Sequence, residues 1–287
     1  MDLGDHSVGH RVRNHCGNAL LDEGHPLGFR LTLGCFGCRW CLEPQLCALD
    51  HLWLDRYPDV FHNGLRGYRP AQMAFGDHSD SEDHIEQIVI QEFIDLGYSY
   101  VNGADISPEG ISQERDFDEV VLKQRLRDAI KKINPNVPND AQEDAIKKLL
   151  RSDSPSLFQN NYNIHKYLTE GVDVEYRKGD RIVGDKVWLI DFENACNNEF
   201  LVVNQFTIIE NNVNKRPDII LFINGLPLVV IELKNAVDEN ATIHSAFNQL
   251  QTYKQAIPSL FLYNALLIVS DGWEALYGSL TGSKQFF

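Results

Sequence analysis

The sequence predicts an α/β fold in which a mixed central β-sheet is flanked by helices. Helical patterns dominate residues 79–168, and short runs of β-branched and apolar residues dominate residues 170–272. A further helical pattern at 242–255 precedes the last predicted strand, an order that favours helices packed on a sheet. The chain has 287 residues, 43% of them hydrophobic, so it can bury a sizeable core.

The first part of the chain carries the predicted helices. An acidic, capping-rich run at 79–84 starts the first helix, and Gly97 ends it. The second helix stops before Pro135, and Asn139 or Asp140 is expected to cap the third. These helices are interpreted as packing elements or as a surface for other subunits. The second, third and fourth helices are predicted at 116–134, 140–151 and 161–168.

The second part carries the predicted strands. They are short, rich in β-branched residues and several of them alternate between apolar and polar positions. The last is an apolar run that closes with Asp271-Gly272, which is typical of a buried strand. The strands are predicted at 172–176, 186–192, 200–210, 218–223, 228–233 and 265–270.

The chain is organised around a predicted hairpin at 216–234. Asn224-Gly225 lies between two apolar runs, which is the strongest short-range signal for a β-hairpin. The outer ends of the two runs carry Asp218, Glu232 and Lys234. The hairpin is therefore expected to gather two carboxylates and an ammonium on one short ribbon.

The register of this hairpin decides whether these groups meet. A strict two-residue loop would pair Asp218 with Ile231 and send Glu232 to the other face. A three-residue loop or a bulge would instead put Asp218, Glu232 and Lys234 on one face. We therefore predict a bulged or three-residue turn.

Two carboxylates and an ammonium are suited to phosphodiester hydrolysis. Carboxylates are the hard oxygen ligands that Mg²⁺ prefers. A bound Mg²⁺ activates water and offsets charge on the phosphodiester oxygens, while a nearby lysine orients that water or helps to deprotonate it. The alternative interpretation is a hairpin whose charged ends lie in solvent.

The same residues resemble a known signature. Arg-Pro-Asp at 216–218, thirteen intervening residues and Glu-Leu-Lys at 232–234 resemble the PD-(D/E)xK nuclease motif. The longer string at 224–234, followed by Ala-Phe-Asn-Gln-Leu-Gln-Thr-Tyr at 246–253, resembles the N-terminal nuclease region of the restriction (R) subunit of type I restriction-modification enzymes. The similarity covers about residues 81–272. It implies a restriction-endonuclease-like fold, with a mixed sheet and helices on both sides.

The resemblance implies roles for the hairpin residues. Asp218 and Glu232 would bind Mg²⁺, and the backbone carbonyl of Leu233 would add a ligand. Lys234 would position the attacking water.

The resemblance also brings in residues from two helices. Glu86 on the first helix would assist the metal or its water, with Glu82 as the alternative. Gln249 and Tyr253 stand four residues apart, hence on one helical face. They match a Gln-x-x-x-Tyr motif whose side chains shape the site and contact DNA.

The function implied is a Mg²⁺-dependent type I site-specific deoxyribonuclease. It would cut double-stranded DNA together with the modification and specificity subunits of a restriction-modification complex. The family continues into a helicase-like motor that hydrolyses ATP, but this sequence contains no G-x-x-x-x-G-K-[ST] motif. ATP is therefore expected only of the full-length family member, and this chain is expected to be a fragment. Two alternatives remain open: a non-catalytic assembly fragment of such a complex, and a stand-alone PD-(D/E)xK repair nuclease.

Residues 1–77 are predicted to form an irregular extension, and residues 78–287 the nuclease-like domain with a helical insertion at about 111–168. Five of the six cysteines fall in the first 47 residues, and Cys-Phe-Gly-Cys-Arg-Trp-Cys at 35–41 has spacing that a zinc site could use. No clean second pair follows. A divergent or non-native extension is therefore the favoured interpretation, with zinc as the alternative.

The net charge of −15 argues against a generally basic coat for nucleic acid. Local clusters can still meet phosphates, for example Arg177, Lys178 and Arg181, or Lys215 and Arg216. No run of eighteen apolar residues and no apolar signal-peptide core is present. We therefore expect a soluble, cytoplasmic protein with no membrane partner.

Overall fold

The computed structural model describes residues 82–234, 243–270 and 275–282 of the chain. The extension predicted at 1–77, with its candidate zinc cysteines, lies outside the described residues.

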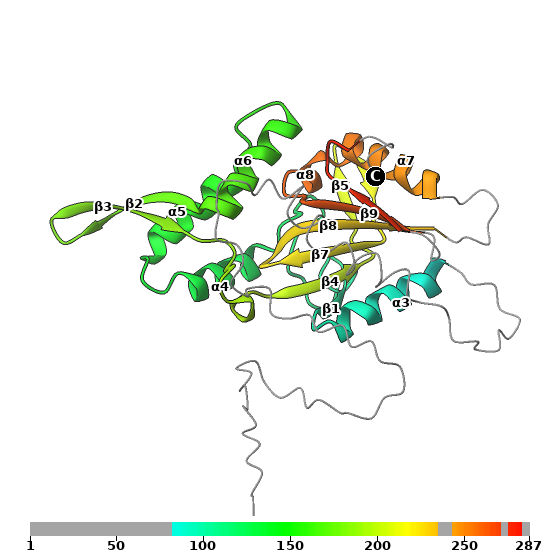
Figure 1. The fold of residues 1–287 in the computed structure, drawn as a ribbon, viewed down its shortest axis with the longest axis horizontal. Helices are drawn as coiled ribbons and strands as arrows, with labels where there is room; N and C mark the ends of the chain where they lie inside the picture. The colour runs from blue at the N-terminus through cyan, green and yellow to red at the C-terminus, as the bar shows by residue number, and fades with distance from the viewer. Residues whose placement is uncertain (1–81, 235–242, 271–274, 283–287) are drawn as a thin grey trace, which may run out of the picture. The chain divides into compact units, whose positions relative to one another are not determined.

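A mixed six-stranded sheet forms the centre of the described part, with the strand order β1-β4-β7-β8-β9-β10 (Figure 1). The β1–β4 and β8–β9 pairs are parallel, and the other three pairs are antiparallel. The predicted mixed α/β fold is thus confirmed. The strands of the sheet are β1 Ser99–Asn102, β4 Phe200–Asn204, β7 Ile219–Ile223, β8 Leu226–Leu233, β9 Leu266–Ser270 and β10 Ala275–Gly278.

Helices cover both faces of the sheet. Side chains alternate along β7, so that Ile219 packs in one cluster with Ile90 of α3, while Ile220 packs in another with Leu250 of α7. Figure 1 shows α3 and α7 on opposite sides of the strands. The helices are α3 Glu82–Asp95, α4 Lys123–Ile133, α5 Asn139–Leu150, α6 Leu157–Glu170, α7 Ile243–Ala256 and α8 Pro258–Phe261, with a short 3-10 turn at Ala195–Asn197.

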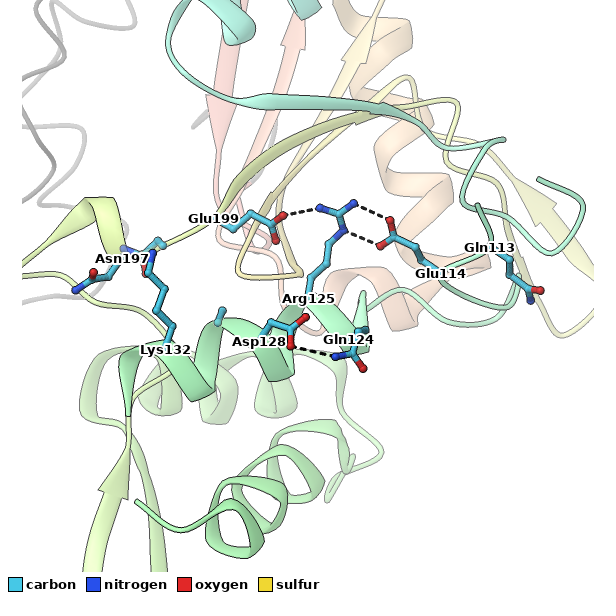
Figure 2. A pocket seen from close by; sticks show the side chains of 10 residues that line it. Gln113, Glu114, Gln124, Arg125, Asp128, Lys132, Asn197 and Glu199 are labelled. Carbon is cyan, nitrogen blue, oxygen red and sulfur yellow. Dashed lines mark hydrogen bonds and ion pairs between the residues drawn. The ribbon is translucent and has the colours of Figure 1, made fainter. Parts of the chain in front are cut away.

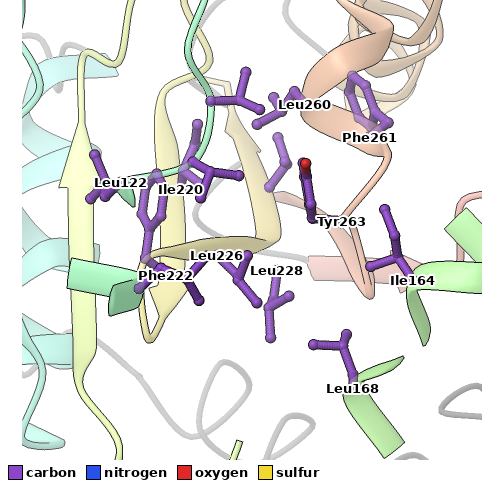
Figure 3. Close-up of a cluster of buried hydrophobic side chains, with 14 of the residues drawn as sticks. Leu122, Ile164, Leu168, Ile220, Phe222, Leu226, Leu228, Leu260, Phe261 and Tyr263 are labelled. Carbon is purple, nitrogen blue, oxygen red and sulfur yellow. The ribbon is translucent and has the colours of Figure 1, made fainter. Parts of the chain in front are cut away.

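Helices α4 to α6 join the same core. Leu168 of α6, Leu228 of β8 and Phe261 of α8 belong to one buried cluster (Figure 3). After α6 the chain forms a two-stranded ribbon from β2 (Val172–Lys178) and β3 (Arg181–Val187). A smaller ribbon pairs β5 (Ile208–Glu210) with β6 (Val213–Lys215).

Two predicted helix starts differ from the structure. The helix predicted at 116–134 begins only at Lys123, because the three residues before it are buried and the Leu122 N–H donates to the Gly225 carbonyl (3.0 Å). The next helix was predicted to be capped by Asn139 or Asp140, but Pro138 holds the cap position and no side chain caps the helix.

Two predicted strands also differ. The strand predicted at 200–210 breaks after Asn204, because Gln205 adopts a positive φ of 54° that a strand cannot contain. Its second part pairs in the separate β5–β6 ribbon. The strand predicted at 186–192 ends at Val187, since β3 begins earlier and pairs with β2.

The central hairpin has a two-residue turn followed by a bulge. Asn224 and Gly225 both adopt positive φ, 53° and 78°, as this turn requires. The predicted three-residue loop is therefore wrong. The predicted bulge is confirmed: the register shifts between Leu221 and Phe222, so that Leu228 is an extra residue in β8. This extra residue shifts the pairing by one position, so that Asp218 and Glu232 share one face of the hairpin.

The turn is held against the start of α4. A Cβ added at Gly225 would lie 2.5 Å from the Leu122 carbonyl oxygen and 2.9 Å from the Leu126 nitrogen. The Asn224 side chain is fully buried, donates to the Leu189 carbonyl (2.8 Å) and accepts from the Glu199 N–H (2.8 Å). Only glycine at position 225 fits the close contact with the start of α4, so the turn and the helix fix each other's positions.

Candidate active site

Asp218 and Glu232 meet at the outer end of the β7–β8 hairpin. Ile219 pairs with Ile231, so the same register places Asp218 opposite Glu232. The Asp218 carboxylate accepts a hydrogen bond from the Leu233 N–H (2.7 Å), which fixes it to the partner strand. Asp218 is partly buried, and Glu232 is fully buried.

The two acids face α7. Ile231 and Leu233 belong to the cluster on the α3 side, whereas Val230 belongs to the cluster on the α7 side. Because side chains alternate along a strand, Glu232 shares the face of Val230. The bulge therefore brings both acids to the side of the sheet that carries the Gln-x-x-x-Tyr helix.

Lys234 completes the group on this hairpin. Its backbone N–H donates to the Ser270 carbonyl of β9 (2.8 Å), and its side chain is only 12% exposed. The ammonium lies 3.4 Å from the Glu232 carboxylate and donates to the Leu233 carbonyl (2.8 Å). In this arrangement the carbonyl predicted to be a metal ligand accepts a bond from Lys234.

Glu86 approaches from α3 and is held by the end of β4. It is 6% exposed and accepts hydrogen bonds from the side-chain amides of Asn204 (2.6 Å) and Gln205 (2.9 Å). The Gln205 N–H in turn donates to the Asp218 carbonyl (3.3 Å). Glu86 is thus linked to the hairpin through Gln205. Glu82 begins α3, and its side chain lies outside the described part of the structure.

Gln249 and Tyr253 lie on the α7 side of the acids. The Gln249 amide donates to the Tyr253 hydroxyl (2.7 Å), which donates to the Arg216 carbonyl (3.4 Å). Burial raises the pKa of Tyr253, and the charges of Glu232 and, less strongly, Asp218 raise it further, against the bond from Gln249. The phenol is therefore neutral and within electrostatic range of both carboxylates.

Sequence reasoning missed Asn204 and Gln205. Both lie inside the strand predicted at 200–210, a pattern that predicts no role for their side chains. The available signal was the change from the apolar run Leu201-Val-Val to Asn-Gln, two amides at the end of a buried strand.

The donor set suits a hard divalent cation. Two carboxylates and a backbone carbonyl are the oxygen ligands that Mg²⁺ takes, with waters in the other positions. Across the described ranges, no three His, Cys, Asp or Glu side chains gather closely enough to hold a metal. Asp218 and Glu232 are the side chains that would hold such an ion.

A cavity of about 660 Å³ lies elsewhere, beside α4 (Figure 2). Arg125 is held there between Glu114 (2.6 Å) and Glu199. These ion pairs raise the pKa of Arg125, mainly through the bond to Glu114. Arg125 also lies near Gly225, at the turn end of the hairpin, so this cavity is separate from the carboxylates.

A mixed sheet flanked by helices, with its acids on a central hairpin, defines a restriction-endonuclease-like domain. Residues 79–286 match the family model described as the type I restriction enzyme R protein N terminus. The chain belongs to this family. None of the described helices has the length and apolar character needed to cross a bilayer.

Curated relatives agree with this assignment. The chain is 43% identical over 209 residues to the type I restriction enzyme HindI endonuclease subunit of Haemophilus influenzae. It is 37% identical over 211 residues to the putative type I restriction enzyme MjaIXP endonuclease subunit of Methanocaldococcus jannaschii. Each match covers 72% of this chain and 20% of the relative. The chain thus spans about a fifth of the length of these relatives.

Proposed function

We propose that this chain is a Mg²⁺-dependent endonuclease domain that hydrolyses phosphodiester bonds of double-stranded DNA as part of a type I restriction complex. The observation that carries the proposal is the register of the bulged hairpin, which sets Asp218 opposite Glu232, whose carboxylate lies 3.4 Å from the Lys234 ammonium. The printed names of the relatives, type I restriction enzyme endonuclease subunits, support the same activity.

Asp218 and Glu232 would hold the ion, together with the Leu233 carbonyl once Lys234 releases it. Bound Mg²⁺ would supply charge stabilisation at the scissile phosphate and activation of water. The fixed position of Asp218, bonded to the Leu233 N–H, means that little rearrangement is needed to present its carboxylate.

Lys234 would orient the attacking water and offset negative charge on the phosphate. Its ammonium lies between the Glu232 carboxylate and the Leu233 carbonyl, in a place that is largely closed to solvent. Such a site strengthens the interaction of the ammonium with a phosphate oxygen compared with bulk water.

Three further residues would support the site. Glu86, fixed by two amide donors, would hold a water that faces the ion. Gln249 and Tyr253, bonded to each other, would shape the α7 wall and contact the DNA backbone. Modification and specificity subunits would be the protein partners, and ATP would be used only by the motor of the full-length family member.

Metal uptake tests this proposal directly. Calorimetry with Mn²⁺ should show binding by the wild-type chain, and Asp218→Asn should weaken it at least tenfold because the substitution removes one of two charged ligands. Asp95→Asn is the matched control, since Asp95 is an exposed acid of α3 that accepts a bond from Gln91. Cleavage of duplex DNA by the reconstituted complex should follow the same order. Mn²⁺ affinity that is unchanged in the Asp218→Asn variant would instead favour the non-catalytic assembly fragment.

A further inference from the structure

The β2–β3 ribbon is anchored through its base, and Tyr176 further along β2 also packs against the main core. Val172, Val174 and Val187 are buried in the main core, where β2 and β3 pack against α5. The Lys148 ammonium of α5 donates to the Asp173 carbonyl (2.8 Å). Beyond these residues the ribbon continues away from the helices, as Figure 1 shows.

The free end of the ribbon is basic. Lys178 pairs with Arg181 across a turn in which Gly179 has a φ of 65°, and Arg177 pairs with Ile182. All three cations are exposed, and in the described part of the chain none of them lies within 4.0 Å of a carboxylate. Asp180 is the one acid at the turn.

Two acids nearer the base of the ribbon already have polar partners. Asp173 forms an ion pair with Lys186 (2.9 Å), and Asp185 accepts a bond from the Tyr176 hydroxyl (3.0 Å). Glu175, two residues before Arg177 in β2, is exposed. The ribbon therefore presents three cations at its end, on a chain whose formal net charge is −15.

We propose that the end of this ribbon, residues 177–182, grips the phosphate backbone of duplex DNA outside the cutting site. An acidic protein approaches DNA most readily through a local basic surface. A two-stranded ribbon fits the major groove, which is about 12 Å wide. Ile182 is 76% exposed beside Arg177, so it offers an apolar contact to the groove floor. The inference rests on the proposed function for the identity of its ligand.

The ribbon and the carboxylates lie at opposite ends of the hairpin strands. Leu189, just after β3, accepts a bond from Asn224 at the hairpin turn, whereas Glu232 lies at the far end of β8. Eight residues of β8 span roughly 25 Å, and the ribbon adds roughly 20 Å. Added end to end, these lengths place the end of the ribbon up to roughly 45 Å from Glu232, which is more than one helical turn of duplex DNA (roughly 34 Å) from the cut.

Fluorescence anisotropy with a 30-bp duplex, in EDTA, tests the grip without cleavage. The variant Arg177→Gln/Lys178→Gln/Arg181→Gln should bind on the order of tenfold more weakly and lower the slope of log K against log salt by about 2–3. The matched control is Lys131→Gln/Lys147→Gln/Lys166→Gln, which removes three exposed cations from α4, α5 and α6. It should change affinity and slope much less.

Equal losses in the two triple variants would overturn the proposal, because they would reflect net charge alone. If the Arg177→Gln/Lys178→Gln/Arg181→Gln variant kept wild-type affinity for DNA but lost binding to the modification subunits, the proposal would also be overturned. The ribbon would then be assigned to a protein partner. Anisotropy in EDTA reports DNA contact without the metal site, whereas Mn²⁺ calorimetry of the wild-type chain reports the metal site alone. A failed metal site therefore gives a different result from a failed grip.

Discussion

The carboxylate of Glu86 accepts a 2.6 Å hydrogen bond from the side-chain amide of Asn204, a residue 118 positions away in the sequence. This bond joins α3 to the end of β4, next to the residue that contacts the Asp218 carbonyl. Both partners are almost fully buried, so the amide satisfies an acid that water cannot reach.

Asn204→Asp should therefore damage the site without changing its shape. A second carboxylate 2.6 Å from Glu86 would place two like charges in a buried place. We expect the free energy of unfolding at pH 7 to fall by roughly 3 kcal/mol, and cleavage to fall with it. Urea denaturation of this variant and of Asn136→Asp, an exposed control, provides the measurement. Equal stability of the two variants would contradict the role given to Asn204.

Lys234→Met should separate the attacking-water step from metal binding. Under the proposed function we expect cleavage to fall at least about 100-fold, because the ammonium that would orient the water is lost. Mn²⁺ affinity should be kept or increased, since removing a cation 3.4 Å from Glu232 removes repulsion toward the ion. Lys234→Arg keeps the charge and changes the geometry, so its activity tells how strictly the ammonium position matters. A Lys234→Met enzyme that cuts at the wild-type rate would exclude this role.

Gly225→Ala should destabilise the fold by about 2–4 kcal/mol, since the new Cβ adds steric overlap to left-handed strain. The overlap is with the Leu122 carbonyl oxygen, 2.5 Å away. Gly179→Ala is a matched control, because Gly179 also has positive φ (65°) but a Cβ added there would meet no atom within 4 Å. It should cost only about 1 kcal/mol. Chemical denaturation of both variants checks the difference, and similar losses would mean that strain alone explains the glycine.

The pH dependence of stability should carry a signature of Lys254. Burial lowers the pKa of this ammonium from 10.5 to about 8 in the folded chain. Between these values the unfolded chain binds more protons than the folded chain, so the free energy of unfolding should rise with pH from about 8 to 10.5. Lys254→Met should remove this rise. Denaturation curves measured at half-unit steps of pH provide the test, and an unchanged profile in the variant would refute it.

The sequence predicted the hairpin because its signals are local. Asn224-Gly225 marks the turn. Asp218 and Glu232 can share a face only if the hairpin contains one extra, unpaired residue. The structure puts that residue in β8 rather than in the loop. Pro227 was the unused signal, since a residue without an N–H cannot donate to the ladder and favours an irregular position in a strand.

Other features depend on contacts that no local pattern contains. The start of α4 is set by the bond between Leu122 and Gly225, about a hundred residues apart, and not by helix propensity. The end of β4 is set by the left-handed Gln205, whose amide is needed at Glu86. Tertiary requirements therefore overrode the apolar periodicity at both places.

The contact between Gly225 and Leu122 has a consequence for anyone trimming this chain. Helices α4 to α6 look removable, because they precede the strands that carry the acids. Excision of these helices together with Leu122 would nevertheless remove the donor to the Gly225 carbonyl and uncover Leu228 and Phe261, which share a cluster with Leu168. A shortened version of this domain must therefore retain the helical segment, whereas the exposed end of the β2–β3 ribbon at 177–182 can be trimmed without opening the interior.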